Sequence, residues 1–217
     1  MARRPRVVVA TRSAHKLREL RQLLGPIEVD LVSLDDAGID PGIEPVEDGR
    51  TFRANARLKA RFYAALTGLP TLADDSGIEV EALGGAPGVR TRRYAGEDAT
   101  DADNNRKLLR ELGGLPPERR GARYVCILAL ALPAVPTRDR RRGRPRIVAE
   151  TRGTCRGRIA LAPRGTGGFG YDPIFEPAVE PVGGRTFGQW TAEAKNAISH
   201  RAKAARRMAP RLAALEG

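Results

Sequence analysis

The segment that most constrains the fold is residues 71–96, where a short apolar run is interrupted by two adjacent acids. Asp74 and Asp75 follow that run and precede Ser76 and Gly77. Carboxylates at the end of a strand suit a divalent cation and its bound water, because Mg²⁺ selects hard oxygen ligands. Neighbouring strand residues face opposite ways, so one Asp is assigned to the chemistry and the other to a supporting role. The alternative is a plain Asp-Asp-Ser-Gly turn between two strands.

The length of 217 residues suits one domain, or one domain with two lobes. The N-terminus is basic, but its apolar run is too short for a signal peptide. The longest apolar run, residues 124–132, is far shorter than the ~20 residues of a membrane-spanning helix. We therefore expect a soluble, cytoplasmic protein with no membrane contact.

Cysteine and histidine are rare in this chain. The two cysteines, Cys126 and Cys155, lack a C-x-x-C spacing, and the histidines are His15 and His200. This pattern disfavours a zinc site and a disulfide framework. Any metal is expected to be held by carboxylates.

The formal net charge of +12 raises the possibility of nucleic-acid binding. The densest basic run, Arg138 to Arg146, lies between two apolar segments and predicts an exposed hairpin loop at about 136–146. The other basic residues are scattered, and aromatic residues are few, which disfavours that function. Only five of the 38 basic residues are lysine, and a lysine supplies a compact point charge where arginine supplies a planar fork.

The first strand–turn–helix unit has the pattern of a phosphate site. Residues 6–10 predict a buried strand, and a helix with Leu17, Leu20, Leu23 and Leu24 on its apolar face ends at Gly25. The turn between them reads Thr11, Arg12, Ser13, Ala14, His15, Lys16. Its basic residues crowd the positive end of the helix dipole, which favours a bound anion. The alternative is a solvated basic turn with Ser13 as the N-cap.

Further elements follow from hydrophobic periodicity and turn residues. A helix from the cap Thr51 to about Leu66, with Phe52, Ala56, Phe62 and Leu66 facing inward, places Asn55 and Lys59 on one face. It leads into the strand that carries Asp74 and Asp75. The other expected elements are strands at residues 27–32, 122–132 and 147–159, a strand that begins at Ile78 and ends at residues 84–88, and a helix at residues 101–112.

A glycine-rich stretch, residues 164–173, formally matches G-x-G-x-x-G. The dinucleotide interpretation is rejected, because that motif follows a strand and opens a helix, whereas here Pro163 precedes it and Asp172-Pro173 closes it. The glycines instead suggest that backbone approaches a flat ligand on which Phe169 stacks. A glycine loop without a ligand is the alternative.

The C-terminal segment, residues 191–215, predicts helix. Lys195, His200 and Arg201 would not share one face of an uninterrupted helix. A break with Ser199 as a new N-cap would place His200 and Arg201 in a first turn. Pro210 is expected to bend or shorten the last helix.

Together these residues resemble the inosine/xanthosine triphosphate pyrophosphatase family. Four blocks, spread over nearly the whole chain, carry the resemblance: residues 11–16; residues 47–52 with Asn55, Ala56 and Lys59; residues 73–77 with 84–88 and 93–97; and residues 165–175 with 195–201. The family usually has Asn where this chain has Ser13, which leaves the substrate contact at that position open.

The resemblance implies an elongated α/β fold, with a twisted mixed central sheet flanked by helices in two lobes and an active-site cleft between them. It also implies a homodimer and Mg²⁺ dependence. Asp75 would bind Mg²⁺ and accept the proton of the attacking water, Glu47 would be a further metal ligand, and Lys16, Lys59 and Lys195 would neutralise a triphosphate. The expected substrate contacts are Thr11, Arg12, Ser13, Ala14, His15, Lys16, Lys59, Ser76, Phe169, Gly170, Tyr171, Asp172, Lys195, His200 and Arg201.

The expected reaction is the hydrolysis of deaminated purine nucleoside triphosphates (ITP, dITP, XTP) to a monophosphate and pyrophosphate, which cleans the nucleotide pool. Two alternatives are a Maf-like pyrophosphatase with another base preference and a basic nucleic-acid-binding module. The acids at Glu47, Asp74 and Asp75 argue against the nucleic-acid-binding module. The Maf-like alternative differs in its substrate profile.

Overall fold

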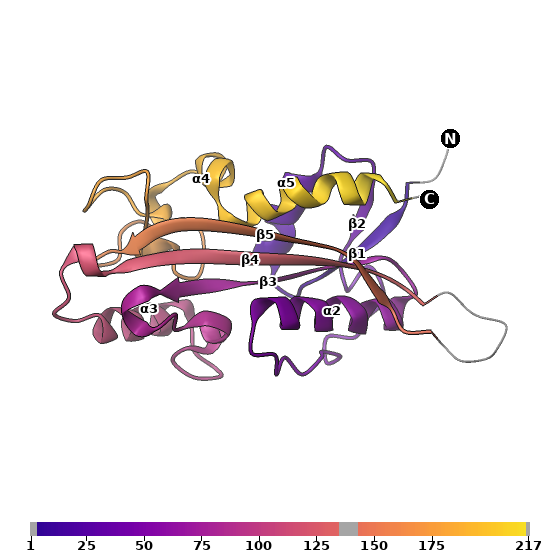
Figure 1. Ribbon diagram of the computed structural model, residues 1–217, viewed down its shortest axis with the longest axis horizontal. Coiled ribbons are helices and arrows are strands. Elements are labelled where there is room, and N and C mark those ends of the chain that lie inside the picture. The colour runs from indigo at the N-terminus through magenta and orange to yellow at the C-terminus, as the bar shows by residue number, and fades with distance from the viewer. Residues whose placement is uncertain (1–3, 135–142, 216–217) are drawn as a thin grey trace. The chain divides into compact units, whose positions relative to one another are not determined.

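The computed structural model describes residues 4–134 and 143–215. A mixed six-stranded sheet with the order β2-β1-β3-β4-β5-β6 forms its centre (Figure 1). The strands are β1 (Arg6–Ala10), β2 (Asp30–Val32), β3 (Thr71–Val80), β4 (Gly121–Leu132), β5 (Arg146–Ile159) and β6 (Phe175–Pro177). β1 is parallel to β2 and β3, whereas β5 and β6 are antiparallel. The α/β class and the mixed sheet flanked by helices are thereby confirmed.

The described residues divide into two compact units. Unit 1 takes its residues from Met1–Asp75, Ile127–Arg152 and Ala202–Gly217, and unit 2 from Ser76–Cys126 and Gly153–Arg201. The predicted Arg-rich loop, Arg138 to Arg146, lies outside the described residues up to position 142, and β5 begins at its last residue.

In unit 1, two helices connect parallel strands. α1 (Ala14–Leu24) joins β1 to β2, and α2 (Phe52–Thr67) leads to β3. Such crossovers are needed because parallel neighbours cannot be joined by a tight turn. Val7, Val8 and Val9 of β1 have no solvent exposure, as expected for a parallel strand covered on both faces. α2 lies against one face of the sheet and α5 (His200–Ala213) against the other (Figure 1).

Unit 2 has its own apolar core. α3 (Asp101–Glu111) covers one face of its part of the sheet, and the segment with α4 (Ala192–Ile198) covers the other (Figure 1). The core combines residues from β3, α3, β4, β5, β6 and the glycine-rich stretch: Ile78, Val80, Leu108, Leu112, Ala122, Tyr124, Cys155, Ile159, Tyr171, Ile174, Phe175 and Phe187.

The capping residues explain why the helices start where they do. Ser13, Thr51, Thr100 and Thr191 accept hydrogen bonds from backbone N–H groups of α1, α2, α3 and α4, which satisfies donors that the first helical turn leaves open. The predicted break at Ser199 is confirmed, because its ψ of 157° separates α4 from α5. α5 continues three residues beyond Pro210.

Three sequence-based boundaries are wrong. β3 is continuous from Thr71 to Val80, so no turn interrupts it at Ser76-Gly77. The strand predicted to run from Ile78 to the glycines ends at Val80, where a short 3-10 turn begins. β2 starts at Asp30 rather than Ile27.

The buried face of α2 also differs from the prediction. Leu66 is 48% exposed, whereas Asn55 and Lys59 are buried. A buried lysine is tolerated when carboxylates compensate its charge, and two carboxylates do so here.

Candidate active site

The two acids of β3 point to different partners. The Lys16 Nζ lies 2.5 Å from Asp74 Oδ1, and the Lys59 Nζ lies 2.9 Å from Asp75 Oδ1. Adjacent strand residues face opposite sides of a sheet, so the two acids of β3 contact lysines from two different helices, α1 and α2. Asp74 and Asp75 are therefore each paired with a different lysine.

The β1–α1 turn is built by its own hydroxyl groups. Thr11 Oγ1 accepts a hydrogen bond from the Ser13 N–H at 3.2 Å, and Ser13 Oγ accepts one from the Lys16 N–H at 3.4 Å. Ser13 is therefore the N-cap of α1, as the alternative of a solvated basic turn also expected. The turn, with Ala14 as the first residue of α1, is a strand–turn–helix unit whose helix start favours an anion.

Acids of the chain itself balance much of the basic charge at this helix start. Arg12 donates to Asp35 Oδ1 at 2.7 Å and to the Asp40 carbonyl at 2.5 Å. Lys16 is paired with Asp74. The predicted clash with the helix dipole is thus reduced without a ligand, and Arg12 fixes the loop that follows β2.

Lys59 brings two carboxylates together. Its Nζ lies 2.9 Å from Asp75 Oδ1 and 3.1 Å from Glu47 Oε2. Burial lowers the pKa of Lys59, but the charges of Asp75 and Glu47 more than offset this, so that pKa is above its ordinary value. Burial also raises the pKa of Asp75, and the nearby Lys59 and Lys16 offset this only in part. Asp75 is therefore a stronger proton acceptor than an exposed aspartate.

This pair of carboxylates fits a magnesium ion that is shared with a phosphate ligand. Both carboxylates lie within 3.1 Å of the same cation, the Lys59 ammonium. No group of three or more His, Cys, Asp or Glu side chains that could hold a metal occurs among the described residues. Mg²⁺ commonly takes one or two carboxylates and completes its shell with water and substrate phosphates, so two carboxylates suffice.

In unit 2, the buried carboxylate of Asp172 organises the glycine-rich stretch. Lys195 Nζ lies 2.7 Å from Asp172 Oδ2, the Phe169 N–H donates to the same oxygen at 2.9 Å, and the Tyr124 hydroxyl donates to Oδ1 at 3.3 Å. Asp172 and Lys195 are 2% and 5% exposed. Gly168 is required at its position, because an added Cβ would lie 2.1 Å from Asp172 Oδ2.

Two cationic side chains, Lys195 and Arg201, lie near the ring of Phe169. Lys195 Nζ is 4.7 Å and Arg201 Cζ is 5.7 Å from the centroid of its ring. Arg201 is 1% exposed and donates to Ser76 Oγ at 2.9 Å. The His200 ring stacks on Tyr124 with centroids 4.6 Å apart. A half-exposed ring held by buried polar groups is a suitable surface for a flat ligand.

The described contacts sort the predicted site residues into two sets. Unit 1 holds Thr11, Arg12, Ser13, Ala14, His15, Lys16, Glu47, Lys59 and Asp75. Unit 2 holds Ser76, Phe169, Gly170, Tyr171, Asp172, Lys195, His200 and Arg201. Two of these side chains have roles that the sequence did not indicate: Lys195 is paired with Asp172, and the Tyr171 hydroxyl donates to the Thr91 carbonyl at 2.9 Å from within the core.

The sequence patterns did not identify three residues that hold the glycine-rich stretch in place: Asp101, Asn105 and Tyr124. Tyr124 lies in an apolar strand that shows no polar signal, although its hydroxyl holds Asp172. Asp101 and Asn105 of α3 bind the backbone of Gly170. Their i, i+4 spacing on one helix face was a usable signal.

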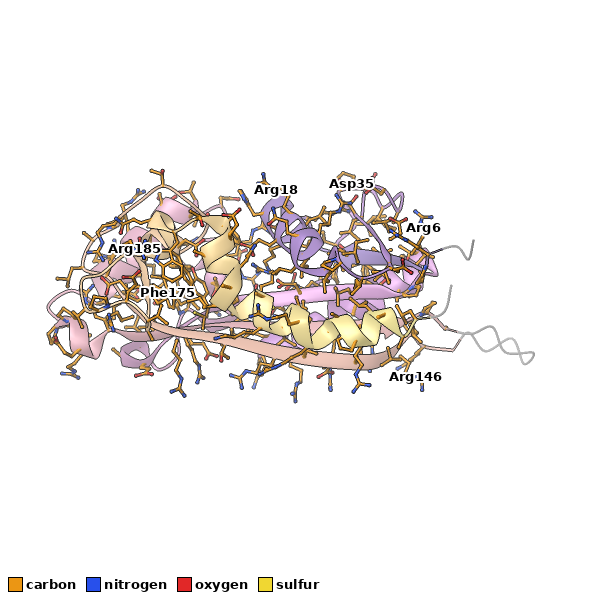
Figure 2. The ribbon with its side chains drawn as sticks, turned by 90° about the horizontal axis from the view of Figure 1, so that it is seen from above. Arg6, Arg18, Asp35, Arg146, Phe175 and Arg185 are labelled. Carbon is orange, nitrogen blue, oxygen red and sulfur yellow. The ribbon has the colours of Figure 1, made fainter. Side chains whose placement is uncertain are left out.

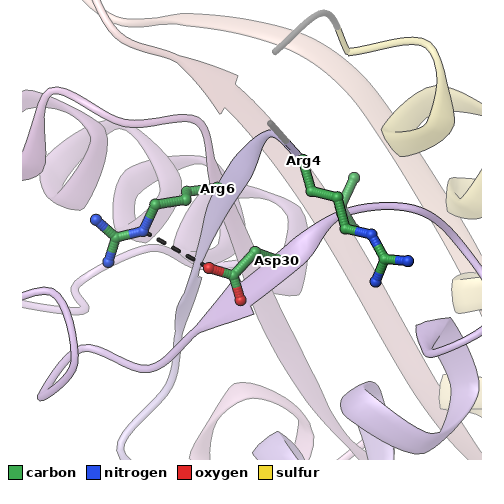
Figure 3. Close-up of a pocket in the computed structure, with 4 residues that line it drawn as sticks. Arg4, Arg6 and Asp30 are labelled. Carbon is green, nitrogen blue, oxygen red and sulfur yellow. Dashed lines mark ion pairs between the residues drawn. The ribbon is translucent and has the colours of Figure 1, made fainter. Parts of the chain in front are cut away.

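An open depression of about 550 Å³ has none of the predicted site residues among the described residues of its lining. Arg4, Arg6, Val29 and Asp30 line it (Figure 3). Arg6 Nε lies 3.7 Å from Asp30 Oδ2, and Arg6 is the first residue of β1. The last residue of β1, Ala10, pairs with Ala73 of β3, which directly precedes Asp74 and Asp75. The basic residues of unit 1 are spread over several elements (Figure 2): β1 carries Arg6, α1 carries Arg18, and β5 carries Arg146.

A parallel β–turn–helix unit beside buried lysine–carboxylate pairs is characteristic of α/β enzymes that act on phosphate compounds. The chain belongs to the Ham1 family, whose model matches residues 7–211. The resemblance inferred from the four sequence blocks is thereby confirmed.

Two relatives and one solved structure illustrate the match. A dITP/XTP pyrophosphatase of Geobacillus kaustophilus is 49% identical over 198 residues, which cover 91% of this chain and 89% of the relative. A dITP/XTP pyrophosphatase of an Anaeromyxobacter species is 45% identical over 230 residues, and the match covers 93% of this chain and 94% of the relative. A HAM1 protein from Coxiella burnetii aligns with a TM-score of 0.78 at 39% identity, over 96% of this chain and 98% of the other. No helix in the described part of this chain is long and apolar enough to cross a membrane.

Proposed function

We propose that this chain hydrolyses deaminated purine nucleoside triphosphates, such as dITP, ITP and XTP, to the monophosphate and pyrophosphate. The family match and the relatives named dITP/XTP pyrophosphatase support this activity. The observation that carries the proposal is the convergence of Asp75 and Glu47 on Lys59, which provides a proton acceptor and phosphate-neutralising charge in one place.

Unit 1 supplies the residues for the triphosphate. The start of α1 and the β1–α1 turn offer N–H groups and a positive dipole to phosphate oxygens. Lys16 and Lys59 add two ammonium groups, and both are paired with carboxylates until a substrate arrives. Such groups stabilise charge that develops on the phosphates in the transition state.

The carboxylates of Glu47 and Asp75 would hold Mg²⁺. When bound, that ion neutralises phosphate charge and polarises the reacting phosphoryl group. Lys59 would then turn from the two carboxylates towards the phosphates, because its ammonium group and the ion would otherwise compete for the same oxygens.

Asp75 is proposed as the group that accepts the proton of the attacking water. The water oxygen forms a bond to the α-phosphorus while the bond from the α-phosphorus to the bridging oxygen breaks. The electron pair of that bond leaves with pyrophosphate, and the water proton moves to an Asp75 oxygen.

Unit 2 supplies the residues for the base. Phe169 would stack on the purine, with Lys195 and Asp172 fixing the loop that carries it. Arg201 and His200 would donate to the carbonyl at C6 of inosine or xanthosine, whereas adenosine has an amino group there. A site that needs a hydrogen bond rejects a substrate lacking the acceptor by a factor of about 10⁴. Direct contact of Lys195 with phosphate stays a prediction from the resemblance.

The resemblance further leads us to propose a cytoplasmic homodimer that cleans the nucleotide pool and needs no nucleic acid. Light scattering in solution tests the dimer. For the activity, a panel of ITP, XTP, dITP, GTP, ATP and pyrimidine triphosphates is assayed for pyrophosphate release with and without Mg²⁺. Selective, Mg²⁺-dependent release from ITP and XTP is expected. A preference for other bases would favour the Maf-like alternative, and release of single phosphates would contradict the proposal.

A further inference from the structure

α3 holds Gly170, the residue that follows Phe169, by both of its backbone polar groups. The Gly170 N–H donates to Asp101 Oδ2 at 2.7 Å. The Gly170 carbonyl accepts from Asn105 Nδ2 at 3.1 Å. Asp101 and Asn105 are four residues apart, so they lie on one face of α3 and form a two-point clamp. All three residues belong to unit 2.

Gly170 needs such support because of its backbone conformation. Its φ is +63°, in the left-handed region that glycine visits readily and other residues avoid. A glycine has many alternative conformations, so free glycine-rich backbone has a large conformational entropy. Two hydrogen bonds from a regular helix select one of these conformations and thereby fix the direction of the preceding residue, Phe169.

The opposite side of this turn is held by Asp172. Its Oδ2 accepts the Phe169 N–H, and the same oxygen is paired with Lys195. Phe169 thus lies between two anchors: one is a buried ion pair, and the other is the clamp from α3. Without the clamp, Phe169 would still be held by its N–H and by its carbonyl, which accepts from the Asp172 N–H at 3.3 Å, but both peptide groups of Gly170 would lose their contacts with α3.

The Asn105 side chain is buried at the contact with Gly170. It is 7% exposed, and its Nδ2 donates to the Gly170 carbonyl at 3.1 Å. A buried amide that loses its hydrogen-bond partner destabilises the folded state, so this contact fixes the Gly170 carbonyl relative to α3.

We propose that Asp101 and Asn105 are positioning residues for base recognition, which act by holding Gly170 so that the Phe169 ring faces the purine. This inference rests on the proposed function and deepens it. The residues touch no reacting atom. Their effect is expected on the affinity for the base and not on the binding of the phosphates.

The test measures the binding of two probes by calorimetry: inosine monophosphate, which has the base, and inorganic tripolyphosphate, which lacks it. Asp101→Ala and Asn105→Leu should each weaken inosine monophosphate by about tenfold, the effect of one hydrogen bond. Both should bind tripolyphosphate as the wild type does. Asp101→Asn keeps an acceptor oxygen and should bind inosine monophosphate within about threefold of the wild type. Asp98→Ala is the matched control, since Asp98 is another exposed acid just before α3 and should change neither affinity.

Amide hydrogen exchange provides the second readout, because a purely structural role would not single out one amide. The Gly170 amide should exchange faster in Asp101→Ala and at the wild-type rate in Asp101→Asn. If Asp101→Ala does not fold, the proposal is decided by the affinity of Asn105→Leu for the two probes and by the Gly170 exchange rate in Asp101→Asn. The clamp is refuted when inosine monophosphate binds the Ala and Leu variants normally, or when both probes weaken equally. A wild-type protein that neither binds inosine monophosphate nor cleaves ITP would instead refute the proposed function.

Discussion

Lys16 and Asp74 form an ion pair with 2.5 Å between Nζ and Oδ1, and the carboxylate side chain of Asp74 has no solvent exposure. The neighbouring acid, Asp75, has a 12% exposed side chain and a second lysine. Burial and partner therefore distinguish two residues that are equivalent in the sequence. Asp74 is suited to holding Lys16, and Asp75 is suited to exchanging a proton.

This difference yields a prediction for the two acids. Asp75→Asn should lower kcat by several orders of magnitude with little change in melting temperature, because the proton acceptor is lost while the shape remains. Asp74→Asn should lower stability by about 1–3 kcal/mol, since it weakens a buried charged hydrogen bond. Steady-state kinetics and thermal melts measure both. If Asp74→Asn loses turnover and Asp75→Asn keeps it, the roles are reversed.

Lys59 provides a test of the metal site that does not use activity. Lys59→Met removes the cation between Asp75 and Glu47, so the two carboxylates repel one another. The melting temperature should fall by several degrees in chelator. Millimolar Mg²⁺ should then raise it more in Lys59→Met than in the wild type, because ligand binding to the folded state stabilises it. An equal response in both proteins would mean that these carboxylates do not bind the ion.

The turn before α1 can be probed at Ser13, where the resemblance leads us to expect an asparagine. Ser13 caps α1 through its hydroxyl, and Asn is an equally good capping residue. Ser13→Asn should therefore keep or lower KM, whereas Lys16→Ala should raise KM strongly. Measurement of KM for ITP checks both variants. A large loss in Ser13→Asn would show that this turn binds phosphate differently from that of its relatives.

Base recognition gives a prediction for Arg201. Arg201→Ala should lower kcat/KM far more for ITP than for ATP and so collapse the ratio between them, because ATP offers no C6 acceptor. Ser76→Ala, which removes one hydrogen-bond partner of Arg201, should have a smaller effect in the same direction. Equal losses for both nucleotides would assign Arg201 to phosphate binding.

The Arg-rich run permits one more prediction from the sequence. Replacement of the arginines between Arg138 and Arg146 by Ser or Gly should leave ITP hydrolysis unchanged. Binding of DNA or RNA at several salt concentrations, before and after the replacement, is the measurement. Loss of salt-sensitive binding in that variant would reveal a second function.

Local patterns predicted most helices and long strands correctly, because their signals are local. Thr51 and Ser199, for example, end one backbone conformation and begin another through their own hydrogen bonds or dihedral angles. The turn expected at Ser76 was wrong for the opposite reason. Polar residues in β3 form hydrogen bonds with residues far away in the sequence. Arg201, for example, donates to Ser76 from 125 positions away, and the sequence alone does not show such contacts.

The same limit applies to the site. The resemblance named Lys16, Lys59 and Asp75, and the helix that carries Lys59 was expected to lead into the strand of the acids. Neither indicated that Lys16 would choose Asp74, 58 positions away, or that Lys195 would pair with Asp172. Pairings of this kind depend on which side chains are buried together, which is a property of the folded chain.

β3 runs without interruption through Asp75 and Ser76, so the proposed proton acceptor and the partner of the proposed base reader are joined by a single peptide bond. A shift of Ser76 moves the peptide unit that it shares with Asp75, because the atoms of that unit lie in one plane. A purine that pulls Arg201 and Ser76 out of place should therefore misdirect the Asp75 carboxylate as well. Proofreading of the base is then expected to appear as slow turnover of the wrong nucleotide, even when that nucleotide is present in excess.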